Sequence, residues 1–66
     1  MRLLRYREVI RDGDGRHHVA DAIAINPQQV SALFAKGQYT WVYMIGAEAS
    51  YIMVDAPFDK VYDDIW

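Results

Sequence analysis

The side chains best suited to bind a metal ion are two neighbouring histidines and an aspartate that follows them. His17 and His18 are adjacent, so in an extended strand they point to opposite faces and cannot hold one ion together. Asp21 shares a strand face with His17, but it lies four residues away and no third ligand is implied. We therefore interpret both histidines as solvated strand residues and expect neither a metal centre nor a cofactor.

The serines and the C-terminal aspartates do not form a catalytic set. Ser31 and Ser50 have no histidine and aspartate partners at a spacing that would activate a nucleophile. Among the aspartates near the C-terminus, only Asp59 and Asp63 share a helix face, and Asp64 lies off it. A solvated acidic face explains them at least as well as a cation site. The sequence thus favours a protein that is not an enzyme.

Aromatic and methionine side chains gather in the second half of the chain. The set that we expect to form a protein interface is Tyr39, Trp41, Tyr43, Met44, Tyr51 and Met53. Both faces of the segment 39–45 are apolar, so both must be covered, and the chain offers a single short helix for the task. Aromatic and methionine enrichment with few charges is typical of interface cores. Core packing alone explains about half of these residues equally well.

Basic side chains crowd into the first sixteen positions. They are Arg2, Arg5, Arg7, Arg11 and Arg16. This arginine strand, together with exposed aromatic rings, is the basis of an alternative function in which the chain binds nucleic acid. The net charge of −2 argues against that alternative, because non-specific affinity comes mainly from phosphate neutralisation. An arginine-rich strand face that prevents promiscuous edge pairing is the favoured interpretation.

Length and composition bound the remaining possibilities. The 66 residues predict one small domain over 1–66, without the disulfides that often stabilise so small a chain, because cysteine is absent. The apolar content predicts self-association, which would bury surface that one small core cannot enclose. Neither a membrane-spanning apolar run nor a signal-peptide pattern is seen, so we expect a cytoplasmic protein that does not enter membranes.

The first half of the chain predicts a hairpin. Residues 1–11 form the first strand, with a bulge or a partly covered second face where Val9 departs from the apolar alternation. Two Asp-Gly pairs over 12–15 form the turn. Residues 16–25 return as a strand, although alanine-rich 19–25 also suits a helix. The segment 26–29 then interrupts the sheet with one helical turn, because proline lacks an amide donor.

The second half predicts three strands and a helix. The strands are 30–34, 39–45 and 50–54, separated by glycine-containing turns. The helix is 57–65, with Asp55 as N-cap and a stripe of Phe58, Val61, Tyr62 and Ile65. We expect Phe58, Val61 and Ile65 to dock on Val42, Val54 and the alanines Ala20, Ala22 and Ala24, with strands neighbouring in sequence also neighbouring in the sheet. The fold class is therefore α+β, an antiparallel β-meander of four to five strands with one short C-terminal helix packed on a face.

A pattern over residues 25–65 resembles small bacterial and phage proteins of the flagellar FlbD-like type. It comprises Ile25-Asn26-Pro27, Val30, Thr40, Val42, Gly46, Val54, the segment 57–61 and Ile65. The resemblance implies a β-meander with a C-terminal helix and a non-enzymatic, regulatory or accessory role. It supplies no catalytic residue.

These observations together predict a protein-protein interaction module. We expect its partners to be another copy of the chain and a host or cellular protein, in the manner of an accessory or phage-encoded regulator or inhibitor. The small nucleic-acid-binding regulator described above is the alternative.

Overall fold

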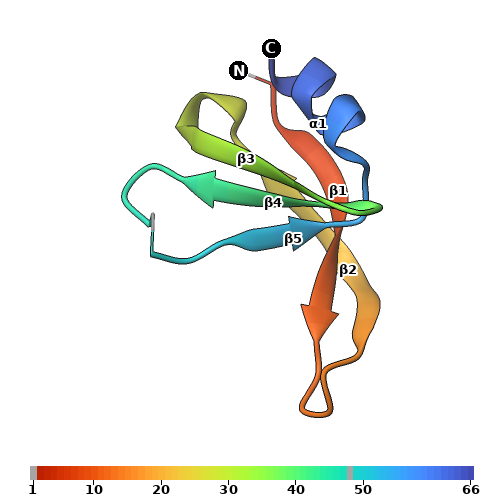
Figure 1. The fold of residues 1–66 in the computed structure, drawn as a ribbon. Coiled ribbons are helices and arrows are strands. Elements are labelled where there is room, and N and C mark those ends of the chain that lie inside the picture. The colour runs from red at the N-terminus through yellow and green to blue at the C-terminus, as the bar shows by residue number, and fades with distance from the viewer. Residues whose placement is uncertain (1, 48) are drawn as a thin grey trace.

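The protein folds into a curved antiparallel sheet with one helix, seen in a computed structural model that describes residues 2–47 and 49–66. The strands are β1 (Leu4–Arg11), β2 (His17–Ile25), β3 (Val30–Lys36), β4 (Tyr39–Met44) and β5 (Ile52–Val54). A 3₁₀ turn, η1 (Pro27–Gln29), precedes β3, and the helix α1 (Phe58–Ile65) ends the chain (Figure 1). The predicted α+β class is confirmed, and residues 19–25 belong to a strand.

The strand order is β2-β1-β5-β4-β3, with every pairing antiparallel. Three of the pairings join strands that follow one another along the chain, as expected. The expected pairing of β2 with β3 is wrong, because β1 pairs with β5 instead, through Glu8 and Val54. Pro27 and the Asn26 side chain, which accepts a hydrogen bond from the Gln28 amide, turn the chain at η1 and send β3 to the far edge of the sheet.

The main core lies between the sheet and the helix. Val42, Val54 and Val61 are fully buried there, and β1 adds Leu4 and Tyr6. From β2 the core receives Ile23 and Ile25. The prediction that the β2 alanines face the helix is wrong: Ala22 and Ala24 are exposed and Ala20 is only half-buried. The isoleucines carry more apolar area, so burying their side of the strand is more favourable.

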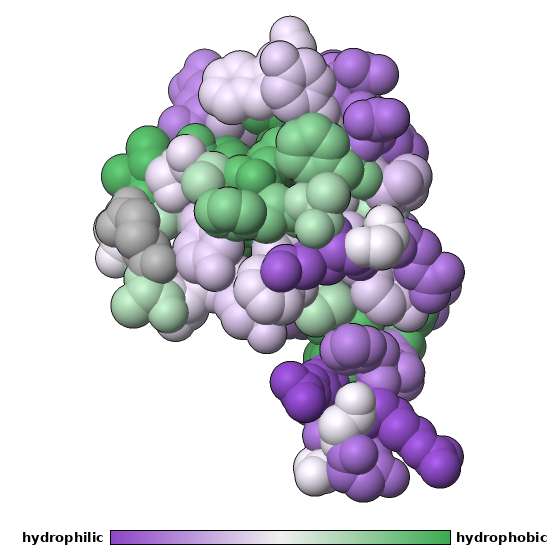
Figure 2. Space-filling view, viewed as in Figure 1, coloured by the Kyte–Doolittle hydropathy of each residue, from purple (hydrophilic) through white to green (hydrophobic). Residues whose placement is uncertain are grey.

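A bulge separates the two halves of the first hairpin. Arg7 pairs with Ala22 and Val9 pairs with Val19, so β2 carries the extra residue. The sequence left open a bulge or a partly covered second face in β1 near Val9. Val9 is buried, so the second face is covered there, while the extra residue of the bulge lies on β2. The tip of this hairpin projects from the body as a hydrophilic arm (Figure 2).

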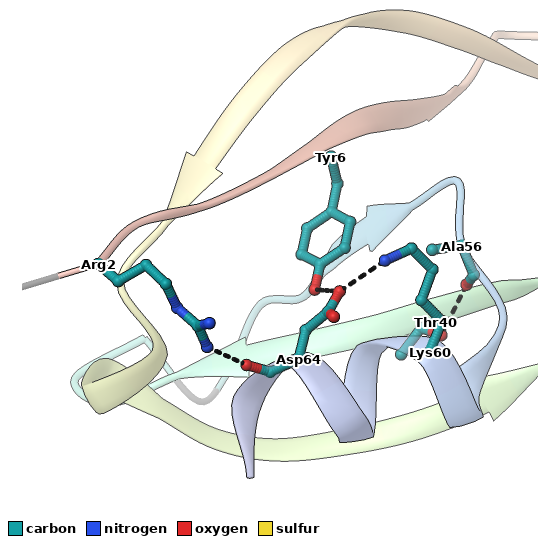
Figure 3. Close-up of polar contacts among 6 residues, drawn as sticks. All are labelled: Arg2, Tyr6, Thr40, Ala56, Lys60 and Asp64. Carbon is teal, nitrogen blue, oxygen red and sulfur yellow. Dashed lines mark hydrogen bonds and ion pairs between the residues drawn. The ribbon is translucent and has the colours of Figure 1, made fainter.

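The helix begins at Phe58, with Pro57 as a cap residue that provides no side-chain hydrogen bond. The prediction of Asp55 as N-cap is therefore wrong, and the Asp55 amide instead donates to the Arg7 carbonyl. Val61 anchors the helix against β3 and β4, whereas Phe58 and Ile65 are half-buried and Tyr62 is exposed. The buried Thr40 hydroxyl donates to the Ala56 carbonyl at 2.8 Å and holds the segment that enters the helix (Figure 3).

Polar contacts fasten the end of the helix to the first strand. Asp64 accepts hydrogen bonds at one carboxylate oxygen from the Tyr6 hydroxyl (2.8 Å) and the Lys60 ammonium (2.9 Å) (Figure 3). Arg2 donates to the Asp64 carbonyl at 2.7 Å. The hydrogen bond from Lys60, followed by that from Tyr6, lowers the pKa of Asp64. Burial, followed by the bond to Asp64, raises the pKa of Tyr6 far above its ordinary value.

Candidate protein interface

The face of the sheet turned away from the main core carries a cluster of packed aromatic rings. Alternation along β4 places Val42 in the core and therefore Trp41 and Tyr43 on the other face. Trp41 stacks on Tyr51 with a centroid separation of 4.0 Å, and Tyr43 lies 6.0 Å from Tyr51. Phe34 meets Tyr43 edge to face at 5.4 Å. We call Phe34, Trp41, Tyr43 and Tyr51 the aromatic face.

The hairpin that joins β3 to β4 fixes the register of this cluster. Gly37 has a φ of 61°, whereas Gln38 is not among the residues with positive φ, which is the sign pattern of a type II′ turn. Lys36 therefore pairs with Tyr39 and Phe34 with Trp41. The Lys36 ammonium lies 4.3 Å from the centroid of the Trp41 ring, so its charge is held over the aromatic face.

Two buried residues belong to this side of the sheet rather than to the main core. Met53 pairs with Trp41 and is 6% exposed. The Glu8–Val54 pair places Val9 beside Met53, and Val9 is also buried. Both lie outside the main core cluster. They form a small second apolar cluster on the same side of the sheet as the aromatic face.

An indole donor in this region has no acceptor. Trp41 is half-buried as a residue, and its Nε1 atom is covered and makes no hydrogen bond within the described part of the chain. A covered donor without a partner costs about 1–3 kcal/mol. Surrounding packing must therefore hold Trp41 in place against this cost.

The other predicted interface residues are distributed as follows. Tyr51, just before β5, is 41% exposed and lies in the aromatic face. Tyr39 contacts His17 edge to face at 5.8 Å, at the end of the face nearest the first hairpin. Met44 packs against the main core on the opposite side, so its assignment to the same surface as Trp41 is wrong. Its even position in the strand already indicated this.

Phe34 and Lys36 belong to the site but were not predicted from the sequence. Phe34 is 50% exposed. Its strand was expected, but the side of the sheet on which it lies depends on the register with β4. The two-residue turn at Gly37-Gln38 is the sequence signal that could have set that register.

The arginines of the first strand do not gather into one stripe. Arg2 is engaged with the end of the helix, and Arg16 lies 3.8 Å from Asp14 in the hairpin tip. Arg5 and Arg7 line an open groove of about 460 Å³. The helix residue Lys60 and the carboxylate Asp55 line the same groove. Arg11, at the end of β1, extends toward the turn at Gly15 and does not line the groove.

The residues considered for catalysis or metal binding are dispersed. His18 lies 3.9 Å from Asp12 across the first hairpin, and the Ser31 hydroxyl donates to the Tyr43 carbonyl. Within residues 2–47 and 49–66, no three histidine, aspartate or glutamate side chains are grouped closely enough to hold a metal ion. The same residues contain no helix with the length and apolar content needed to cross a membrane.

Comparison of the chain with protein-family models, with curated proteins and with solved structures finds no match. The resemblance to FlbD-like proteins stays a prediction.

Proposed function

We propose that this chain is a non-enzymatic protein-interaction module that binds a second copy of itself, and through that assembly a target protein, by way of its aromatic face. The observation that carries the proposal is the packed set of rings on the side of the sheet that the helix leaves uncovered. Phe34 is 50% exposed and Tyr51 is 41% exposed, while Trp41 and Tyr43 are half-buried between them.

The physical properties of this surface suit binding to protein. The rings are already packed against one another, so little side-chain entropy remains to be lost when a partner arrives. Tryptophan and tyrosine carry much of the binding energy at the centres of interfaces. The Lys36 ammonium lies over the Trp41 ring, 4.3 Å from its centroid.

An accessory regulator or inhibitor acting in the cytoplasm is the role that we propose for such a module. The nucleic-acid alternative is weaker because base stacking needs cations alongside the rings. Lys36 is beside the aromatic face, but Arg5 and Arg7 line a groove near the start of the helix. Retention on heparin that falls steeply with salt would favour the alternative; absence of retention favours the protein interface.

The test is a set of single substitutions with a matched control. Trp41→Ala or Tyr43→Glu removes a ring that neighbours Phe34 in the aromatic face and should shift the assembly toward monomer in sedimentation velocity, with the circular dichroism spectrum of a folded protein preserved. Tyr62→Ala removes an aromatic ring that is 49% exposed on the helix and should leave the assembly unchanged. If all three variants assemble like the wild type, the aromatic face is not the interface.

A further inference from the structure

The two edge strands of the sheet differ in how well they are protected from pairing with another chain. An edge strand presents unpaired amide and carbonyl groups, which natural proteins shield with charges, bulges or prolines. The β2 edge is interrupted by its bulge and carries Asp21 in its middle. The β3 edge has a bulge only at its beginning, near Ser31, and pairs regularly with β4 from Ala32 to Lys36. This regular part has neither proline nor carboxylate.

Lys36 is the single charged residue of β3, and its ammonium group does not shield the open edge of this strand from pairing. An edge lysine normally discourages pairing by placing its ammonium beside the open strand. Here the ammonium lies over the Trp41 ring, on the aromatic face. The side chains along the remaining edge are Ala32, Leu33, Phe34 and Ala35, which offer no charge to repel a second strand.

The hairpin register determines which backbone groups face outward. Lys36 and Tyr39 flank a two-residue turn and therefore form a hydrogen-bonded pair. Hydrogen-bonded and non-hydrogen-bonded pairs alternate in an antiparallel ladder, so Phe34 also directs its amide and carbonyl toward β4. The amides and carbonyls of Leu33 and Ala35 then point away from the sheet, to the open edge.

We propose that β3 pairs antiparallel with β3 of a second copy, so that the two sheets join into one continuous sheet about a two-fold axis near Phe34. The inference rests on the proposed self-association and refines its geometry: Phe34 is the member of the aromatic face that lies at the contact between the copies, and the other rings lie side by side rather than face to face. With the axis at Phe34, Leu33 of one copy lies opposite Ala35 of the other, and each such pair exchanges both backbone hydrogen bonds. Lys36 falls opposite Ala32, so no like charges meet.

The same geometry explains why the occupant is a second copy. A two-fold axis perpendicular to the sheet keeps the aromatic faces of both copies on the same side and the helices on the other. The Phe34 rings become cross-strand neighbours, and aromatic pairs of this kind stabilise sheets. Two aromatic faces thereby merge into one larger surface, and the isologous contact closes the assembly at a dimer.

Ala35→Pro tests this pairing, with Ala24→Pro as its control. Proline at 35 removes an amide directed to the open edge while leaving the β3–β4 ladder and the aromatic rings in place. Ala24 is an exposed residue on the β2 edge, and its pairing with Arg5 likewise directs its amide outward. Sedimentation equilibrium should show Ala35→Pro weakening the dimer more than about tenfold, and Ala24→Pro leaving it unchanged.

The outcomes separate this inference from the proposed function. If folded Ala35→Pro still dimerises while Trp41→Ala does not, the copies meet through their aromatic faces and the edge pairing is overturned. A monomeric wild type would overturn both. Should Ala35→Pro fail to fold, hydrogen exchange of the wild type decides: the amides of Leu33 and Ala35 must gain protection as concentration rises, and protection independent of concentration would overturn the pairing.

Discussion

Val61→Ala is the substitution that should most clearly reveal how the helix is held. Val61 is fully buried among core residues from the sheet, including Val42 and Val54. The substitution removes two buried carbons, and each one lost from the core costs about 0.8 kcal/mol of burial free energy. It also leaves a cavity that a shift of the eight-residue helix cannot fully close, which adds to the cost. The expected loss in the free energy of unfolding is about 2–3 kcal/mol.

That loss is large for a domain of this size. At about 0.05–0.15 kcal/mol per residue, 66 residues imply a total of roughly 3–10 kcal/mol. The expected fall in melting temperature is about 10–20 °C. Circular dichroism melts at fixed concentration would measure it, with Tyr62→Ala as the control on the same helix. Equal shifts for the two variants would show that Val61 is not the anchor. Phe58 is only half-buried, so Phe58→Ala should cost less than the roughly 3–5 kcal/mol that is typical of a fully buried phenylalanine.

Three further predictions concern polar contacts. Thr40→Val should lower the free energy of unfolding by about 1–3 kcal/mol because the Ala56 carbonyl loses its hydrogen-bond donor. Thr40→Ser keeps the hydroxyl and should retain most of the wild-type stability. Equal urea midpoints for the two variants would refute the role of the hydroxyl. The pKa of Asp64 is lower in the folded than in the unfolded protein, so the ionised carboxylate contributes to the free energy of unfolding above about pH 4, and this contribution is lost as the pH falls. Asp64→Asn should therefore make the free energy of unfolding fall less steeply with decreasing pH. An unchanged dependence on acidic pH would contradict this. The pKa of Tyr6 is higher in the folded than in the unfolded protein, so the neutral hydroxyl contributes fully to the free energy of unfolding below about pH 10, and this contribution is lost as the pH rises further. Tyr6→Phe should therefore make the free energy of unfolding less sensitive to alkaline pH, which a spectroscopic titration can detect.

Local patterns predicted the elements well because strand alternation and turn residues act over short distances. Trp41 and Val42 were correctly placed on opposite faces of β4 by their positions alone. The β1–β5 pairing was missed because it joins residues far apart in the chain, and no local signal specifies it. The face of β2 was assigned wrongly because both parities are apolar, so alternation could not decide between Ile23 and the alanines.

The candidate site was predicted in part for the same reason. Trp41, Tyr43 and Tyr51 were recognised by residue type, and the structure brings their rings together. Phe34 and Lys36 join them through cross-strand register, which sequence alone specifies only through the turn between them. The open β3 edge could not be foreseen at all, because it follows from the strand order.

Sedimentation equilibrium of the wild-type chain across a broad concentration range tests the proposed self-association. A module that self-associates through the open β3 edge and the Phe34 ring at that edge should show a reversible monomer–dimer equilibrium, with the dimer predominating at high concentration. A single monomer mass at every concentration, from a chain that is folded by circular dichroism, would show that the protein does not self-associate.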